Sequence, residues 1–546
     1  MTRVLVIGGG GVFGHRLAEG LVANGFEVVI AGRNLERARS LAAELATARP
    51  GARVSAVRLD TATLTPADLA ATGAVIVADA AGPFQGAAPL TAQAAIAGGL
   101  HYVDLADARD FVAAFPGLDT AARAAGVVAL TGCSSTPALS NAVLDDLTRG
   151  WTEIVSVEAA ISPGARAPRG RSVMEATLSW FGRPVRVFRA GGWSVAHGWS
   201  GLRRRDLGRA GHRLVSLCET PDLDIFAARF KPRDSATFLA GIEPGAAHLA
   251  ACLLAMLVRL GLLDLRRSPG ALVALSRPFS TLGNDRGAMR VAAYGRDAKG
   301  RAVRTAWRLV ADPGKGPVTP SLPALAAIKA IVANEVEPGA GACVGIVTLA
   351  ALETEIAAHP IATERSVERA SLFARSIGAA FDALPEAIRE LHETPGRSTW
   401  RGEADTQGAE DPVGRLVARV FGFPAARQGC PVKVEVTTDG KRSQWKRRIG
   451  KNLFRSELSN ARPGGRITER FGPFSFDIVL GPSFSGLAYD IRGWSLGLIP
   501  MPAFLAPRSE TSESVDAEGR FNFDVLIALP WGSRLVHYRG WLRRET

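Results

Sequence analysis

The sequence predicts an α/β protein that begins with a doubly wound parallel sheet, continues into a second α/β domain and ends in a mainly antiparallel β domain. Three observations support this class. Short apolar runs alternate with helical patterns through the first third, a glycine cluster follows the first run, and β-type segments separated by turn residues fill the last quarter. Alternating strands and helices with short connections are typical of a parallel sheet covered by helices on both faces.

The length of 546 residues is too great for a single core and indicates several domains. We place their boundaries where pattern and composition change. The predicted parts are an α/β domain over 1–135, a second domain over 136–390, a linker rich in glycine, proline and charge over 391–413, and a β-rich domain over 414–546.

Individual elements follow from apolar periodicity. The first domain has expected strands at 3–7, 27–31, 54–59, 74–78, 102–105 and 127–130, and expected helices at 15–24, 35–46, 89–97 and 118–125. In the last domain the expected strands are 432–438, 444–449, 467–471, 474–480, 486–490, 521–528 and 535–541. The first two of these last strands flank a short polar turn and predict a hairpin, and the set is typical of a sandwich or barrel.

Charge and cysteine usage narrow the function classes. The net charge of +13 comes mainly from arginine and suits an anionic ligand or a membrane surface. No groove-reading motif accompanies it, so no nucleic-acid partner is predicted. Five scattered cysteines contain no CxxC pair, which favours a reducing cytoplasm and predicts no metal site. Because a strand-like run begins after Arg3, no signal peptide is expected.

The longest apolar stretch, residues 246–263, is interrupted by His248 and Arg259. It barely reaches the roughly 20 residues that cross a bilayer. We expect a buried or interfacial helix here, and peripheral membrane contact is the alternative interpretation.

Residues 4–14 read VLVIGGGGVFG, in which Gly9, Gly11 and Gly14 match the GxGxxG fingerprint of dinucleotide-binding turns. The glycines permit a tight turn, close approach of the pyrophosphate to the backbone, and packing of helix on strand. The N-terminus of the following helix then binds the diphosphate. The predicted contacts along this loop are Gly9, Gly10, Gly11, Val12, Phe13 and Gly14.

The end of the second strand indicates which dinucleotide binds. An NAD site places an acidic residue there, whereas this strand is followed by Arg33 and Asn34. A guanidinium complements the 2′-phosphate of NADP, so NADP is the predicted cofactor. The alternative is an exposed arginine that merely opens a helix. Further residues expected near the cofactor follow the third, fourth and sixth strands, namely Asp60, Ala81, Gly82, Pro83, Phe84 and Cys133.

Asp104, Asp107 and Arg109 follow the fifth strand and are the candidate catalytic residues. An acid held near an arginine could anchor a substrate amine or relay a proton. A structural ion pair is an equally weighted interpretation, and Cys133 could simply be buried. The arginines of 166–171 and 203–205 could bind anions, although solvated surface charge is the commoner explanation. His197, His212 and His248 are each expected to be structural.

Three ordered segments, AAGPFQG (80–86), HYVDLADARDFV (101–112) and GCSSTPALSNAV (132–143), resemble the saccharopine dehydrogenase-like oxidoreductases. APRGR (167–171), GWSGLRRRDLG (198–208) and GACVGIVTLAALE (341–353) extend the resemblance to about residue 375. It implies an NADP-binding Rossmann domain followed by a domain for substrate and dimer contacts. The tail, with RFGPFSFDIVL and LPWGSRLVHYRGWL, resembles an uncharacterised β-rich domain that recurs behind such proteins.

Together these features predict an NADP(H)-dependent oxidoreductase that transfers hydride to or from a C=N or C=C bond of a small or lipid-like substrate. A homodimer is expected from the resemblance. The competing hypothesis is a non-catalytic NADP-binding scaffold associated with lipid, in which the β-rich tail carries the working surface.

Overall fold

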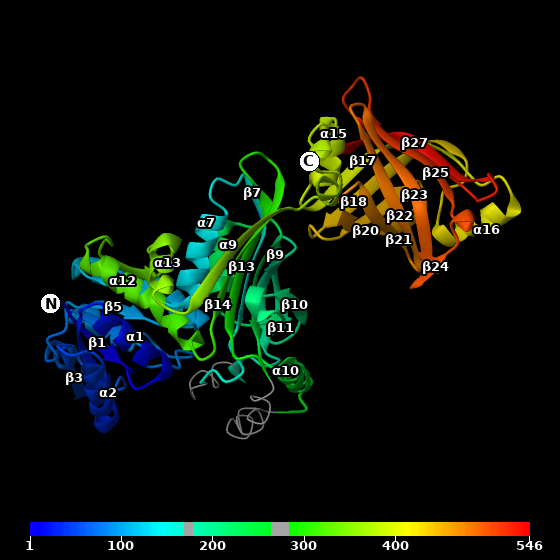
Figure 1. The fold of residues 1–546 in the computed structure, drawn as a ribbon. Coiled ribbons are helices and arrows are strands. Elements are labelled where there is room, and N and C mark those ends of the chain that lie inside the picture. Colours follow the sequence, from blue (N-terminus) through cyan, green and yellow to red (C-terminus); the bar gives the residue numbers. More distant parts are fainter. Residues whose placement is uncertain (169–177, 264–282, 546) are drawn as a thin grey trace. The chain divides into compact units, whose positions relative to one another are not determined.

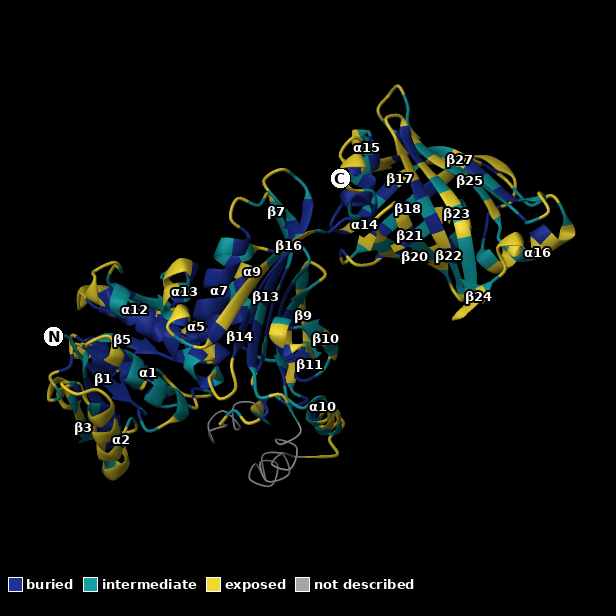
Figure 2. Ribbon diagram, viewed as in Figure 1, coloured by how far each residue is buried: buried dark blue, intermediate teal, exposed yellow. Residues whose placement is uncertain are grey.

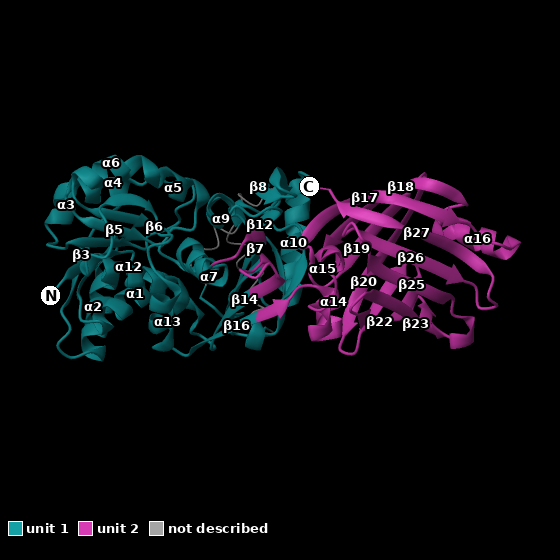
Figure 3. Cartoon of the chain, turned by 90° about the horizontal axis from the view of Figure 1, so that it is seen from above, with its two compact units in different colours: residues 1–149, 156–293, 306–366 teal, residues 150–155, 294–305, 367–546 magenta. Residues whose placement is uncertain are grey.

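The computed structural model describes residues 1–168, 178–263 and 283–545, and the chain divides into two compact units (Figures 1 and 3). Unit 1 comprises residues 1–149, 156–293 and 306–366. Unit 2 comprises residues 150–155, 294–305 and 367–546. Each unit has its own sheet core, and each is described separately below.

Unit 1 begins with a seven-stranded parallel sheet in the order β15-β6-β5-β4-β1-β2-β3. The order reverses between β1 and β4, as in doubly wound dinucleotide-binding sheets. The predicted Rossmann fold is therefore confirmed. Its strands are β1 (Arg3–Ile7), β2 (Glu27–Gly32), β3 (Val54–Arg58), β4 (Ile76–Asp79), β5 (His101–Asp104), β6 (Val128–Thr131) and β15 (Gly339–Ala342).

Helices cover both faces of this sheet (Figure 3). One face carries α1 (Val12–Ala23), α2 (Leu35–Ala48), α12 (Leu322–Val332) and α13 (Leu349–Ala357). The other face carries α3 (Pro66–Ala70), α4 (Leu90–Ala97), α5 (Arg109–Ala114) and α6 (Asp119–Ala124). The central strands β1, β2 and β4 are mainly apolar because both of their faces are buried, whereas the edge strand β3 has no fully buried residue (Figure 2).

A second, nine-stranded sheet follows, with β8 and β9 as a ribbon at its side. Its strands are β7 (Glu153–Ser162), β8 (Pro184–Arg189), β9 (Gly192–His197), β10 (Arg203–Asp206), β11 (His212–Leu217), β12 (Ser235–Gly241), β13 (Gly287–Arg296), β14 (Ala302–Ala311) and β16 (Ile361–Arg369). Parallel pairing of β7 with β12 and antiparallel pairing of β10 with β11 make the sheet mixed. The helices that accompany it are α7 (Ser140–Leu147), α9 (Asp222–Phe230) and α10 (Gly245–Arg259).

Helix α10 contains most of the long apolar stretch. His248, Ala251 and Ala255 are buried, whereas Leu253 and Met256 are about half exposed. The outward-facing side of α10 is therefore apolar and exposed to solvent. Within the described residues, no helix has the length and apolar character needed to cross a bilayer.

Unit 2 contains an eleven-stranded antiparallel sheet. Ten of its strands close into a ring, because β22 pairs with β23 as well as with β21, and β24 pairs with β23 outside the ring. The resulting barrel confirms the predicted β-rich domain and its first hairpin, β18–β19. The strands are β17 (Gly396–Gln407), β18 (Arg427–Thr438), β19 (Ser443–Ile449), β20 (Asn452–Arg462), β21 (Arg466–Phe471), β22 (Phe474–Ser483), β23 (Gly486–Leu496), β24 (Ile499–Met501), β25 (Arg508–Val515), β26 (Phe521–Ala528) and β27 (Arg534–Arg544). The helices of unit 2 are α14 (Leu372–Ile377), α15 (Glu386–Glu393) and α16 (Pro412–Phe421).

The segment predicted as a linker, 391–413, is instead largely strand β17, which pairs with both β18 and β27. Ser398, Trp400 and Ala404 point into the barrel and are buried, while Arg397 and Arg401 point outward. The composition suggested a linker because the charged half of this alternating strand is on the solvent side.

Gly402 allows β17 and β27 to approach closely, since a Cβ there would lie 1.7 Å from the carbonyl oxygen of Trp541. We expect Gly402→Ala to destabilise unit 2 by about 1–3 kcal/mol or more, as overpacked cores do. Thermal unfolding followed by circular dichroism measures the change. Arg401→Ala, at the neighbouring exposed position, is the matched control and should change stability by less than about 1 kcal/mol. Equal melting temperatures for both variants would contradict the close-packing argument.

Candidate functional site

The glycine cluster forms a tight turn between β1 and α1. Gly8 has φ of +75°, and the Gly11 N–H donates a hydrogen bond to the Gly8 carbonyl oxygen (2.8 Å). A Cβ at Gly14 would lie 2.4 Å from that same oxygen, so no side chain fits there. Gly11 is the N-cap of α1, whose first turn contains no acidic side chain. The unpaired N–H groups of this turn are suited to a diphosphate.

Gly8, which the fingerprint does not include, is the most constrained residue of the turn. Besides its positive φ, a Cβ on Gly8 would approach the carbonyl carbon of Ala80 to 2.8 Å. The signal that could have identified it is its position immediately after the last strand residue, Ile7, where the chain must turn.

Arginines surround the carboxyl ends of β2 and β3. Arg33 is exposed immediately after β2, and Asn34 caps α2 by accepting a hydrogen bond from the Arg37 N–H (3.0 Å). The Arg37 side chain lies over the glycine loop, since a Cβ at Gly10 would be 3.1 Å from its Nε. Arg58 is the register partner of Gly32 at the end of β3. No salt bridge to another described residue engages Arg33, Arg37 or Arg58.

Arg37 and Arg58 were not among the sequence-predicted site residues. Their signals were the i, i+4 spacing of Arg33 and Arg37, and the position of Arg58 as the last residue of a strand. Only the strand register shows that Arg58 reaches the same edge of the sheet.

The remaining predicted cofactor residues lie at the same edge or beneath it. Asp60 follows β3 and accepts a hydrogen bond from the Ala62 N–H (3.1 Å). Phe84, in the segment after β4, packs on Phe111 with ring centroids 5.0 Å apart. Cys133 is fully buried, and burial raises the pKa of its thiol well above the ordinary value.

A cavity of about 400 Å³ opens beside the glycine loop within unit 1. Phe13 of α1, Gln85 after β4, Asp107 after β5 and Thr136 after β6 form one wall. The rest is mostly apolar and comes from the second sheet, α10 and nearby loops: Ile161, Phe181, Trp199, Phe238, Ala251, Leu254, Met289 and Leu309. A cavity of this volume has the size typical of small-molecule sites.

Of the candidate catalytic residues, Asp107 is the one that lines the cavity. Its Oδ1 accepts a hydrogen bond from Gln85 Nε2 (3.0 Å). Desolvation by burial raises the pKa of this carboxyl group, and the Gln85 hydrogen bond opposes that shift. A carboxyl group in this environment holds its proton to higher pH than a solvated one.

Asp104 and Arg109 have structural partners. Asp104 Oδ1 accepts hydrogen bonds from the N–H groups of Gly132 (2.7 Å) and Ala106 (2.9 Å), while burial raises its pKa to about 7. Arg109 is buried and pairs with Glu219 (3.2 Å) and Asp224. Glu219 lines the cavity and Arg109 does not, so Arg109 contributes to the cavity by holding the Glu219 carboxylate in place.

Three other sequence candidates, Arg203, Arg205 and His248, are not among the residues that line the cavity. Arg203 and Arg205 both pair with the buried carboxylate of Glu158 (3.3 and 2.7 Å). His248 accepts a hydrogen bond from the Ile242 N–H, and burial lowers its pKa to about 4. It packs against the ring of Trp199, in keeping with a structural histidine. Arg169 and Arg171 lie outside the described residues.

Comparisons with known proteins agree with this geometry at the domain level. Residues 4–145 match the saccharopine dehydrogenase NADP binding domain, and residues 384–542 match a domain of unknown function, DUF4166. None of the curated proteins searched matches the chain.

Among solved structures, the chain is similar to apo saccharopine dehydrogenase (L-Glu forming) from Saccharomyces cerevisiae, with 14% identity, 67% of this chain and 100% of that chain covered, and a TM-score of 0.48. Menthone neomenthol reductase from Mentha piperita matches with 23% identity over 15% of this chain and 32% of its own, with a TM-score of 0.14. Both scores are too low to carry an argument. The family matches therefore relate two separate regions of this chain to two domain families, the saccharopine dehydrogenase NADP binding domain and DUF4166.

Proposed function

We propose that the chain is an NADP(H)-dependent oxidoreductase that transfers hydride to or from a C=C or C=N bond of an apolar substrate. The observation that carries this proposal is the cavity of about 400 Å³ that shares Phe13 with the cofactor loop. A substrate in this cavity lies at the edge of the sheet where dinucleotides bind. The substrate and the cofactor site therefore meet within unit 1.

Arg33, Arg37 and Arg58 are the residues we assign to the 2′-phosphate of NADP. They approach one edge from α2 and from the ends of β2 and β3. A phosphate dianion would neutralise guanidinium groups that no described acidic side chain pairs with. The glycine turn and the first turn of α1 would hold the diphosphate.

The cavity lining supports an apolar substrate without carboxylate or phosphate groups. Among its described lining residues there is no arginine, lysine or histidine, and its ionisable carboxyl groups are Asp107, Glu219 and Glu243. An anionic substrate would meet repulsion there with no compensating cation. A neutral alkene or a basic imine fits this lining.

Asp107 is the residue we assign to proton transfer. NADPH, when bound, supplies the hydride that reduces one atom of the double bond. In its protonated form, the Asp107 carboxyl group would give its proton to the other atom and would be reprotonated from solvent afterwards. Gln85 orients the carboxyl group through its hydrogen bond. Buried donors without a described partner, Trp199 Nε1 and Thr220 Oγ1, also belong to lining residues and can position a polar substrate atom.

Arg33→Ala is expected to weaken NADPH binding about 10- to 100-fold, because it removes a charged hydrogen-bonding partner worth about 1.5–3 kcal/mol. NADH binding should change little, since NADH lacks the 2′-phosphate. Fluorescence titration with both cofactors measures the ratio. Arg39→Ala is the matched control, because Arg39 lies on α2 but pairs with Glu36 (2.8 Å). Equal affinity of the unaltered protein for NADPH and NADH would refute the 2′-phosphate assignment.

Asp107→Asn is expected to lower the reduction rate about 10²- to 10⁴-fold, the usual contribution of a general acid. In the unaltered enzyme the rate should fall as pH rises through the pKa of Asp107, which burial has raised, because the carboxyl group then loses the proton that it donates. The residual rate of the variant should lose this pH dependence. Asp110→Asn, an exposed change on α5, is the control. Oxidation of NADPH is followed by absorbance with a panel of apolar enoyl esters, enones and cyclic imines.

NADPH binding without turnover of any member of this panel would favour the non-catalytic scaffold. An unchanged pH profile in an active Asp107→Asn variant would instead remove Asp107 from the mechanism while leaving the oxidoreductase proposal intact.

A further inference from the structure

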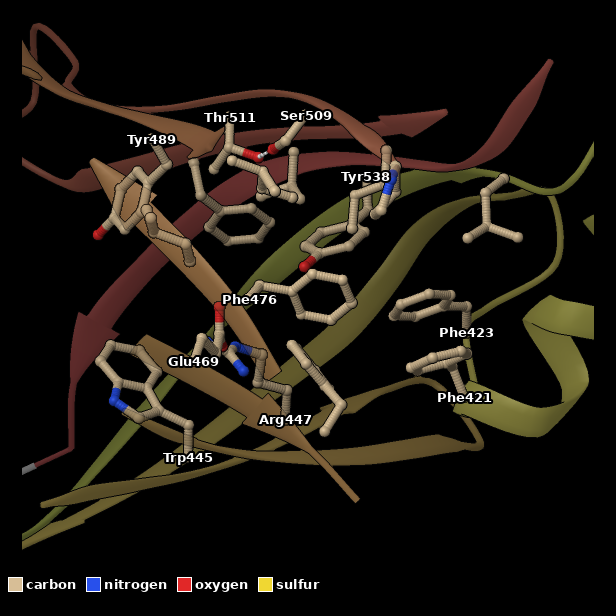
Figure 4. Close-up of a pocket in the computed structure, with 18 of the residues that line it drawn as sticks. Phe421, Phe423, Trp445, Arg447, Glu469, Phe476, Tyr489, Ser509, Thr511 and Tyr538 are labelled. Carbon is tan, nitrogen blue, oxygen red and sulfur yellow. Dashed lines mark hydrogen bonds and ion pairs between the residues drawn. The ribbon is translucent and has the colours of Figure 1, made fainter. Parts of the chain in front are cut away.

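The barrel of unit 2 encloses a second cavity, of about 500 Å³ (Figure 4). Natural cores contain few voids larger than a water molecule, because unfilled space forfeits dispersion contacts. Barrels of about eight strands are just filled by side chains or hold one small ligand, and wider ones enclose more space. Closure through the β22–β23 pairing gives a ring of ten strands, which is wider than an eight-stranded barrel.

The cavity wall is mainly aromatic and aliphatic. Figure 4 shows Phe421 and Phe423 at one end, Trp445 at the other, and Phe476 between them. Further apolar residues from several strands complete the wall: Val432, Val434, Ile449, Ile478, Ile491, Phe521, Val525 and Leu542. Such a surface favours a ligand that is largely hydrocarbon.

The opening of the cavity is apolar as well. Leu416 and Val420 on α16 line the cavity although they are 64% and 72% exposed, so they lie at its mouth. Leu505 lines it too and is 41% exposed. An apolar molecule that enters the cavity would therefore contact apolar side chains at the opening.

Every charged side chain in the described lining has a partner inside unit 2. Arg447 pairs with Glu469 (3.4 Å), and Ser456 bonds to both of them (2.7 and 2.6 Å). Glu513 accepts a hydrogen bond from the Tyr489 hydroxyl (2.8 Å) and contacts His392 Nε2 (2.7 Å). Because no charge is left over, an ionised ligand would be buried without a counterion at a high cost. A neutral molecule would not carry this cost.

The Tyr538 hydroxyl also faces the cavity, and no hydrogen-bond partner is described for it. Tyr538 is 8% exposed, and in Figure 4 its hydroxyl points toward Phe476 in the interior. Burial raises its pKa to about 12, so the hydroxyl keeps its proton and can donate a hydrogen bond. A hydroxyl or carbonyl oxygen on the ligand would satisfy it.

We propose that the C-terminal barrel binds one neutral lipid-sized molecule, held by its aromatic walls and by a hydrogen bond between the Tyr538 hydroxyl and a hydroxyl or carbonyl group of the ligand. This site is separate from the cavity of unit 1 and does not depend on the oxidoreductase proposal.

The test uses the full chain, stripped of co-purified lipid, and the neutral fluorescent probe N-phenyl-1-naphthylamine. Thr511 on β25 lines the cavity, whereas its neighbour Ser512 points outward. Thr511→Trp should fill the cavity and weaken probe binding at least tenfold, while Ser512→Trp should leave it unchanged. Ser509→Phe provides a second interior change, since Ser509 also lines the cavity. Circular dichroism establishes that each variant is folded.

Probe binding that is the same in folded Thr511→Trp or Ser509→Phe as in Ser512→Trp would overturn the proposal, including the case in which the probe occupies only the cavity of unit 1. Competition then tests the chemistry of the ligand. Dodecanol should displace the probe better than dodecanoate, and Tyr538→Phe should weaken dodecanol about fivefold, the loss expected for one neutral hydrogen bond. Stronger displacement by dodecanoate would show that the site takes anions and would overturn neutrality.

Discussion

The close approach of Gly14 to the Gly8 carbonyl oxygen is the constraint on which unit 1 depends. A Cβ at position 14 would lie 2.4 Å from that oxygen, so residue 14 must be glycine, while the positive φ of Gly8 and its contact with Ala80 require glycine there as well. This contact aims the N-terminus of α1 at the carboxyl edge of the parallel sheet. The segments after β2, β4, β5 and β6 reach the same edge, because all these strands run in one direction.

A largely buried ion-pair cluster lies beside the unit 1 cavity, which one of its members, Glu219, lines. Arg109 binds Glu219 and Asp224, and its guanidinium also donates to the carbonyl oxygen of Arg186 (2.9 Å). Desolvation offsets most of the attraction in such a cluster, so its contribution is mainly to geometry. The cluster leaves Asp107, two residues earlier in the chain, free to face the cavity. Asp104, the last residue of β5, therefore has a structural role, whereas Asp107 in the segment after β5 lines the cavity.

The structure of unit 2 depends on the closure of its antiparallel sheet into a barrel. Its strands alternate buried and exposed residues, and closure of the sheet removes the free edges that would otherwise promote association. The closed barrel encloses an interior that its side chains do not fill completely. Large aromatic side chains reduce that space but leave a cavity of about 500 Å³, in which paired charges are spaced among apolar groups.

Local patterns in the sequence were enough to predict the doubly wound Rossmann fold, the glycine turn and most strands of the barrel. They are short-range signals: a glycine run after an apolar strand, alternation with period two, and turn residues between strands. The same patterns misassigned β17 as a linker, because its inward residues are few and its outward ones are charged. They also missed β15, a four-residue GAGA strand with no side-chain pattern to detect.

Which side chains meet was decided only by the tertiary structure. Arg58 joins Arg33 and Arg37 through strand register, and Glu219 reaches Arg109 from more than a hundred residues away. The sequence identified Asp104, Asp107 and Arg109 as one group of candidate catalytic residues. In the structure, Asp104 and Arg109 are buried against structural partners, whereas Asp107 lines the cavity. The two cavities exist because sheets curve and close around them, and no local pattern reports the volume left inside. The sequence by itself determined the elements and the cofactor, whereas long-range packing decided the sites, because a site is a juxtaposition of segments that the chain keeps far apart.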